Sequence, residues 1–258
     1  MTDVDPNGSP QSSSQPPRRD AARTFLAAVL VLCAVALLAV LVPGVLPLTL
    51  RSRIGMAGPQ PDTTGSFAFL AHQPGEPRIP VTYSPCLPIR VQVNPDGGPA
   101  DAVALVQQAM DRVGAATGLR FEYAGLTSQR PRWRSTYLPQ LAEADTPVLV
   151  SWATPQEVPQ LVGDVAGIGG SVWAGEAGGT RRYVTGGVTL DSGAFAELAR
   201  RPDAQAEEEA IVLHEFGHLV GLGHVDDPGQ LMYRRNIGRT DFGPGDLAGL
   251  ARLGKGSC

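Results

Sequence analysis

The sequence has little positive charge in clusters, and no basic run or basic–aromatic interleaving in it suggests a nucleic-acid-binding surface. Its 21 lysines and arginines are outnumbered by 25 aspartates and glutamates, so the formal net charge is −4. A nucleic-acid-binding surface needs clustered positive charge to neutralise phosphates, and this composition excludes that class of function. Cysteine and histidine are also scarce, with three and four residues in the whole chain. Each of these few side chains can therefore be considered by its position.

The composition is otherwise that of a globular protein, with 43% hydrophobic and 18% charged residues among 258. This length fits one domain with appended segments, or two small domains. Residues 1–23 are rich in proline, serine and glutamine, so they cannot bury a core. We predict a disordered cytoplasmic tail there.

Only one long apolar run occurs, over residues 25–42, and it contains no charged side chain. As a helix it would reach about 27 Å, close to the hydrocarbon thickness of a bilayer. Because arginines precede the run, we expect a single transmembrane anchor over 24–42, with the bulk of the chain outside the cell. The alternative is a cleaved signal peptide and a secreted protein, although this run exceeds the usual apolar core of about 7–15 residues.

Proline and glycine are frequent over residues 43–85, which show little periodicity and predict a stalk. The remaining 86–258 are long enough for one domain. Since Cys33 lies in the apolar run, Cys86 and Cys258 remain as one pair on the outer side, where disulfides persist. We therefore predict a Cys86–Cys258 disulfide between the start and the end of the domain.

Hydrophobic periodicity within this domain predicts a mixture of strands and helices. Alternating or continuous apolar patterns predict strands over 87–93, 119–123, 147–153, the residues around Val172, and 183–191. Helical spacing of apolar residues predicts helices over 101–113, 207–220 and 246–253. This order indicates an α+β or mixed α/β domain with one twisted sheet of about five strands.

Three of the four histidines lie in the stretch HEFGHLVGLGH, residues 214–224. His214 and His218 are four residues apart on the predicted helix, so both imidazoles can reach one metal ion. Gly221 permits a sharp turn that brings His224 back as a third ligand. Three neutral nitrogens leave one tetrahedral position for water, which is typical of a catalytic zinc site. Glu215 can accept a proton from that water.

This stretch resembles the metzincin zinc endopeptidases, whose pattern is H-E-x-x-H-x-x-G-x-x-H followed by a Met-turn. Met232, in the sequence LMY, matches the Met-turn, and the helix and turn together look most like those of the matrixins. The resemblance implies that His214, His218 and His224 are zinc ligands, that Glu215 is the general base, and that Met232 supports the metal from below. It also implies a metzincin-like catalytic domain, with an active-site helix and a C-terminal helix.

The same resemblance places the strand near Gly170–Ala174 at the sheet edge above the helix, where an extended peptide could pair with it. Tyr233 is expected to pack near a specificity pocket lined by residues 233–242, and not to bind the metal. The chain departs from the matrixins at Val225, where they usually have serine, and it has no proline after Tyr233 and no cysteine-switch segment. His72, in the predicted stalk, cannot by itself supply the second zinc site of animal matrixins.

One catalytic Zn²⁺ is thus the expected cofactor. Calcium is a further possibility, although no D-x-D-x-D-G loop is present, and its candidate ligands are scattered: Asp164, Asp191, Asp226, Asp227 and Asp241. We expect a monomeric, membrane-anchored, extracytoplasmic zinc endopeptidase that hydrolyses peptide or protein substrates. Two alternatives stay open: a zinc-stabilised envelope binding module without turnover, against which the intact Glu215 argues, and a hydrolase of cell-wall peptide cross-links.

Overall fold

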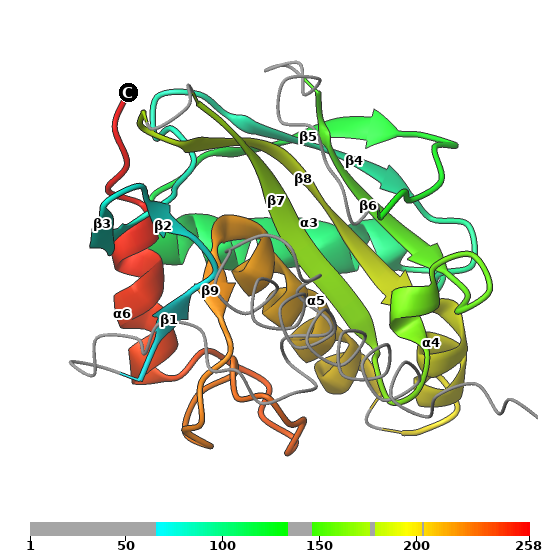
Figure 1. Ribbon diagram of the computed structural model, residues 1–258. Coiled ribbons are helices and arrows are strands. Elements are labelled where there is room, and N and C mark those ends of the chain that lie inside the picture. Colours follow the sequence, from blue (N-terminus) through cyan, green and yellow to red (C-terminus); the bar gives the residue numbers. More distant parts are fainter. Residues whose placement is uncertain (1–65, 134–145, 176–178, 203) are drawn as a thin grey trace, which may run out of the picture. The chain divides into compact units, whose positions relative to one another are not determined.

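The computed structural model describes residues 66–133, 146–175, 179–202 and 204–258 (Figure 1). Their elements follow in this order: β1 (Ala68–Phe69), β2 (His72–Gln73), β3 (Glu76–Pro80), β4 (Ile89–Asn94), α3 (Ala102–Thr117), β5 (Phe121–Leu126), β6 (Val148–Ala153), the 3₁₀ turn η2 (Pro159–Leu161), β7 (Gly167–Ala174), β8 (Arg182–Asp191), α4 (Ser192–Leu198), α5 (Ala204–Val220), β9 (Leu222–Gly223) and α6 (Pro244–Leu253).

Five strands form the main sheet in the order β5-β4-β6-β8-β7. The strands β5, β4, β6 and β8 run parallel to one another, whereas β7 pairs antiparallel with β8 and ends the sheet on one side. Helix α3 connects the parallel neighbours β4 and β5, which is the βαβ unit that parallel pairing requires. The predicted mixed α/β domain with a five-stranded sheet is confirmed.

Two long helices, α3 and α5, lie side by side against one face of this sheet (Figure 1). The buried side of α3 repeats at helical spacing through Leu105, Val106, Ala109, Met110 and Val113. The face of α5 that meets the sheet includes Leu213, Phe216 and Leu219, none of which has measurable exposure. The amphipathic pattern in the sequence thus fixes α5, and with it the histidines, beneath β7 and β8.

The sequence placed the end of α3 one turn too early. The sequence analysis ended the helix at Val113, with Gly114 and Gly118 as the glycines that close it, but the helix runs to Thr117 and ends at Gly118, which has a φ of +78°. The Gly118 N–H bonds to the Gly114 carbonyl, so this left-handed residue closes the last turn. The sequence reading also missed α4, whose N-terminus is capped by the Asp191 carboxylate through a 2.7 Å bond from the Ala194 N–H.

The predicted stalk boundary at residue 85 is wrong, because residues 66–85 belong to the folded domain. Strand β1 pairs with β9, directly before His224, and Val81 and Tyr83 are buried in the core. The Tyr83 hydroxyl also lies 2.6 Å from Ser171 Oγ on β7. Strands of two to five residues among prolines and glycines carry too little periodicity to be detected. Residues 43–65 lie outside the described part of the chain.

None of the helices within the described ranges is long and apolar enough to cross a membrane. The predicted anchor at 24–42 and the predicted tail at 1–23 lie outside those ranges.

Cys86, before β4, and Cys258, after α6, form a disulfide with a Cα–Cα distance of 5.5 Å, as the sequence predicts. The bond ties the entrance of the first long strand to the residue after the last helix, across 172 positions of sequence. Cross-linking so long a loop restricts the unfolded chain strongly.

Replacing both cysteines with serine is expected to lower the free energy of unfolding by about 5 kcal/mol, the chain-entropy value for a loop of this length. Urea denaturation of the oxidised chain and of the double variant measures the difference. Cys33→Ser is the control and should leave the midpoint unchanged. Equal midpoints for the double variant and the unaltered chain would show that the bond contributes no stability.

Candidate metal centre

Helix α5 ends where the sequence predicts the turn that carries the third histidine. Gly221 has a φ of +118°, a conformation that residues with a Cβ rarely adopt. Its N–H bonds to the carbonyls of Gly217 and His218 and closes the helix. Strand β9 then pairs with β1, and the chain returns toward α5 at His224.

The three imidazoles converge through their Nε2 atoms. His224 Nε2 lies 3.1 Å from the Nε2 atoms of both His214 and His218. The Nδ1 atom of His214 is 2.8 Å from the Leu231 carbonyl, and that of His218 is 2.8 Å from the Leu222 carbonyl. Since a carbonyl only accepts, both Nδ1 atoms carry the hydrogen, and the Nε2 lone pairs of these two rings point toward the common centre.

This donor set fits zinc. Two nitrogens at zinc's usual bond length of about 2.0–2.1 Å and at a tetrahedral angle are about 3.3 Å apart, close to the 3.1 Å found here. Burial lowers the pKa of His214 and, together with the neighbouring His214 and His224, sets the pKa of His218 well below its usual value. Desolvation and the nearby His214 and Arg234 lower the pKa of His224 to about 4. Each imidazole is therefore neutral near pH 7, which is the form that binds a metal.

Glu215 lies beside these rings and is 6% exposed. One of its carboxylate oxygens, Oε2, is buried without a hydrogen-bond partner. Burial raises the pKa of this carboxyl to about 8, and a hydrogen bond from the Gly169 backbone acts in the opposite direction. A buried carboxylate oxygen without a partner is costly unless a ligand or water completes it.

Glycines in β7 make room for this glutamate, and the sequence analysis did not single them out for that purpose. A Cβ on Gly167 would lie 2.8 Å from Glu215 Cγ, and one on Gly169 would lie 2.9 Å from the Glu215 carbonyl carbon. Strand β7 can therefore pack this close to α5 only because Gly167 and Gly169 have no Cβ. The sequence GIGG within a strand was the available signal, because glycine in a strand often marks a close approach of another backbone.

Gly169→Ala is expected to separate β7 from α5, move the Glu215 carboxylate, and cost about 1–3 kcal/mol of stability, as overpacking does. The neighbouring Gly170→Ala is the matched control, because its Cβ would meet only Trp133, at an ordinary 3.7 Å. Thermal unfolding of both variants measures the effect. A melting temperature for Gly169→Ala equal to that of Gly170→Ala would show that the contact is not tight.

Met232 packs against the helix that carries His214 and His218. It is 1% exposed, and its sulfur would be 2.7 Å from a Cβ placed on Gly217, one residue before His218. The thioether therefore packs directly on the helix backbone between the two helical histidines. Glycine at 217 is thus needed for this contact.

The turn that carries Met232 is held by the N-terminus of α6. Asp246 Oδ2 accepts the backbone N–H groups of Leu231, at 2.6 Å, and Gly243, at 2.9 Å. In return, Gln230 Oε1 accepts the N–H groups of Gly245 and Asp246, at 2.8 and 3.0 Å. Because the Leu231 carbonyl also receives His214 Nδ1, these bonds connect α6 to a ring of the metal centre.

Tyr233 lines the same cavity as the histidines. Among the described residues, His214, His218 and His224 are the one set of three or more His, Cys, Asp or Glu side chains whose ligand atoms gather within 4.8 Å. Four of the five aspartates considered for calcium have other roles, and the fifth, Asp164, lines the cavity. Asp191 caps α4, Asp226 pairs with Arg234, Asp227 accepts the Gly229 N–H, and Asp241 pairs with Arg112.

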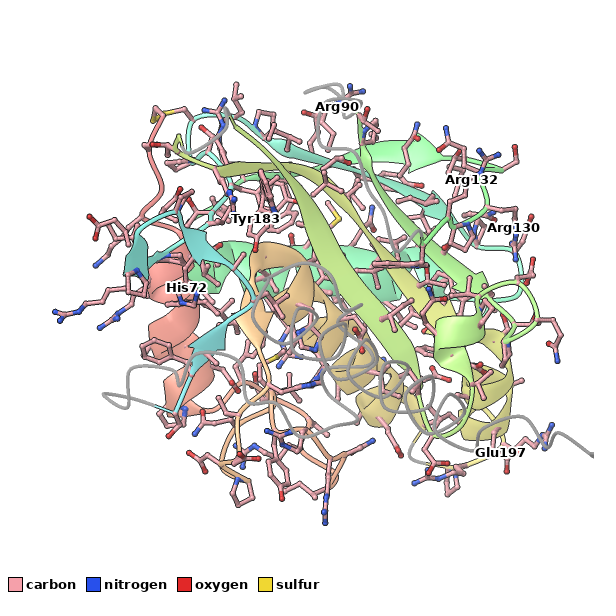
Figure 2. The ribbon with its side chains drawn as sticks, in the orientation of Figure 1. His72, Arg90, Arg130, Arg132, Tyr183 and Glu197 are labelled. Atoms are coloured by element: carbon pink, nitrogen blue, oxygen red, sulfur yellow. A yellow bond between two sulfur atoms is a disulfide. The ribbon has the colours of Figure 1, made fainter. Side chains whose placement is uncertain are left out.

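His72, the fourth histidine, lies on β2 (Figure 2), where its ring is 6.0 Å from that of Phe69. It does not join the three clustered histidines. Partial burial lowers its pKa.

A cavity of about 460 Å³ opens over the three histidines. Its walls come from the N-terminal part of β7, from α5 and from the segment after Met232. The cavity, the convergent imidazoles and the buried carboxylate together form a site where a bound metal and an organic substrate can meet.

Residues 156–248 match the family model described as Matrixin. No curated protein matches the chain in sequence. Among solved structures, an archaemetzincin from Methanopyrus kandleri is similar at 16% identity and a TM-score of 0.41, over 64% of this chain and 93% of that one. The GM1-bound form of the ECX AB5 holotoxin is similar at 14% identity and a TM-score of 0.43, over 78% and 93%. TM-scores this low do not establish a shared fold, whereas the family match spans every residue of the metal centre and identifies that segment as matrixin-like.

Proposed function

We propose that this chain is a zinc-dependent endopeptidase of the metzincin type, matrixin-like. The observation that carries the proposal is the pairing of three convergent Nε2 atoms with one buried, unpartnered oxygen of Glu215. A protein that used the metal only for stability would need the imidazoles but not this carboxylate. His214, His218 and His224 are the proposed zinc ligands.

Zinc bound by three imidazoles supplies a Lewis acid and lowers the pKa of water to about 7. Glu215 accepts the proton of the attacking water and passes it to the nitrogen of the cleaved amide. The new bond joins the water oxygen to the carbonyl carbon, and the bond that breaks joins that carbon to the nitrogen. Leu231 and Leu222 hold the rings of His214 and His218 in place through their carbonyls.

The substrate is proposed to bind as an extended peptide along β7. This strand ends the sheet, and its N-terminal residues line the cavity together with Glu215. An edge strand offers backbone N–H and carbonyl groups to a peptide, which gives binding without dependence on side chains.

The test is metal analysis and peptide cleavage by the full-length purified chain. We expect one zinc per chain and cleavage of a mixed peptide library, abolished by a chelator and restored by Zn²⁺. One zinc per chain with no cleaved peptide would instead identify a binding module. Cleavage that survives complete removal of zinc would contradict the proposed chemistry.

We also propose that residues 24–42 anchor the chain in the cell membrane, with the catalytic domain outside the cytoplasm. The uncharged apolar run supports the anchor, and the Cys86–Cys258 disulfide supports an oxidising compartment. Protease added to intact cells should then digest the domain. A mature N-terminus after residue 42, found in the culture medium, would show cleavage and secretion instead.

A further inference from the structure

The segment that follows the Met-turn brings arginines to the cavity over the histidines. Arg234, Arg235 and Arg239 all line it, and we call residues 234–239 the arginine segment. It lies between Tyr233 and α6, so it is held at one end by the turn that carries Met232 and at the other by the Asp246 bonds.

The three guanidinium groups differ in their partners. Arg234 is paired, with its Nε on Asp226 Oδ1. Arg235 is exposed and forms no ion pair or hydrogen bond with another described residue. Arg239 is half-buried, and its Nε is buried without a hydrogen-bond partner. The guanidinium of Arg235 and the Nε of Arg239 are therefore without a hydrogen-bond partner among the described residues.

Two carboxylates lie near Arg239, and the hydrogen bonds that they accept come from other groups, while Asp246 Oδ1 is buried without a partner. Asp227 accepts the N–H of Gly229 at 2.8 Å and Gln230 Nε2 at 2.9 Å. Asp246 accepts the backbone N–H groups of the Met-turn and of Gly243. Hydrogen bonds, first of all from Ser66, lower the pKa of Asp227, whereas burial raises the pKa of Asp246. The charge of Arg239 acts on both carboxyls in the lowering direction, so it lies close to them, yet its Nε has no hydrogen-bond partner.

Elsewhere the walls of the cavity carry little negative charge. Glu215 is beside the metal centre, and Asp164, before β7, is the other carboxylate in the lining. Apolar side chains, among them Ile211 of α5 and Ile237 of the arginine segment, form much of the remainder. The cavity is therefore apolar with a positively charged wall, which suits a ligand group that has methylenes and ends in a carboxylate.

We propose that Arg235 and Arg239 form a carboxylate-binding subsite, so that the preferred substrates carry an acidic group within a few residues of the cleaved bond. This inference rests on the proposed peptidase function. Guanidinium groups bind carboxylates through paired, charge-assisted hydrogen bonds, and the half-buried setting of Arg239 reduces screening by water. The carboxylate can come from a glutamate or aspartate side chain, or from the C-terminus of a peptide.

The experiment compares matched peptides based on one sequence that the full-length chain cleaves. One set is C-terminally amidated and carries Glu, Gln or Lys at each position around the cleaved bond in turn. A second set carries Gln at all of these positions and ends either in a free carboxylate or in an amide. We expect kcat/KM for one Glu position to exceed that for Gln by about tenfold or more, the value of a hydrogen bond to a charged group, and Lys to be worst. A preference confined to the second set would assign the subsite to a terminal carboxylate.

Arg235→Glu should remove or invert this preference while zinc content stays at the level of the unaltered chain. Arg90→Glu is the matched control, because Arg90 is an exposed arginine on β4, away from the metal centre (Figure 2), and the change in net charge is the same. Arg239→Lys keeps the positive charge but loses the planar guanidinium group that binds a carboxylate through two hydrogen bonds. It should therefore reduce the preference for Glu over Gln, and by less than Arg235→Glu does.

The outcomes separate this inference from the proposed function. Cleavage with equal kcat/KM for Glu and Gln at every position, and for free and amidated ends, overturns the subsite and leaves the peptidase intact. If no peptide is cleaved, the same labelled peptides are used in an anisotropy assay. Tighter binding of a Glu or free-carboxylate peptide, lost in Arg235→Glu but not in Arg90→Glu, then supports the subsite, and equal binding rejects it.

Discussion

Glu215→Gln is expected to reduce peptide cleavage by about 10²–10⁴-fold, the contribution of a positioned general acid–base group, while zinc content stays at one per chain. Glutamine has nearly the shape of glutamate, so the close contacts with Gly167 and Gly169 are preserved. It cannot accept the proton from water, and it cannot pass one to the leaving nitrogen. The expected loss is therefore in kcat, with little change in the melting temperature or in metal binding.

The control for this variant is Glu209→Gln on the same helix. Glu209 is outside the cavity, where it accepts a 3.1 Å hydrogen bond from Gln205, one turn earlier. Cleavage by this control should equal that of the unaltered chain. If Glu215→Gln cleaves as fast as the control, the proton transfer assigned to Glu215 is wrong. Loss of zinc from Glu215→Gln would show that the carboxylate serves the metal and not the water.

The metal centre could be predicted from sequence because its determinants are local. His214 and His218 share a helix face by helical geometry, and Gly221 adopts the positive φ that the turn needs. The five strands and three main helices of the sheet domain were also detectable, since each is at least six residues long and has a clear pattern. These features depend on residues close to one another along the chain.

The features that were missed depend on contacts between distant segments. Strand β1 is two residues long, and only its pairing with β9 makes it a strand. The role of Asp246 required knowing that the start of α6 meets the Met-turn. In the same way, the need for glycine at position 169 is explained only by the backbone of α5, which packs closely against it at Glu215. The glycines of GIGG could indicate that some backbone comes close to the strand, but not which one, because the partners in these contacts lie from 15 to about 155 residues apart along the chain.

His218→Ala is expected to remove zinc from the chain and, with it, the stabilisation that zinc provides. A ligand present at about 1,000 times its Kd stabilises a folded protein by about 4.1 kcal/mol, which is about 8–16 °C in the melting temperature of a domain of this size. The unaltered chain should therefore melt at a clearly higher temperature with Zn²⁺ than after chelation. His218→Ala should melt at one temperature under both conditions.

Packing must be separated from metal binding in this test, because His218 is only 8% exposed and bonds the Leu222 carbonyl. His224→Ala provides the separation, since His224 is exposed and its removal leaves the core filled. Like His218→Ala, it should lose zinc and the increase in melting temperature that zinc causes. Unlike His218→Ala, it should melt at the same temperature as the unaltered chain after chelation. His72→Ala removes the one histidine outside the cluster, so it should retain both the metal and the rise. One zinc per chain and an undiminished rise in His218→Ala or His224→Ala would mean that the metal binds elsewhere, and that the convergence of the three Nε2 atoms has another cause.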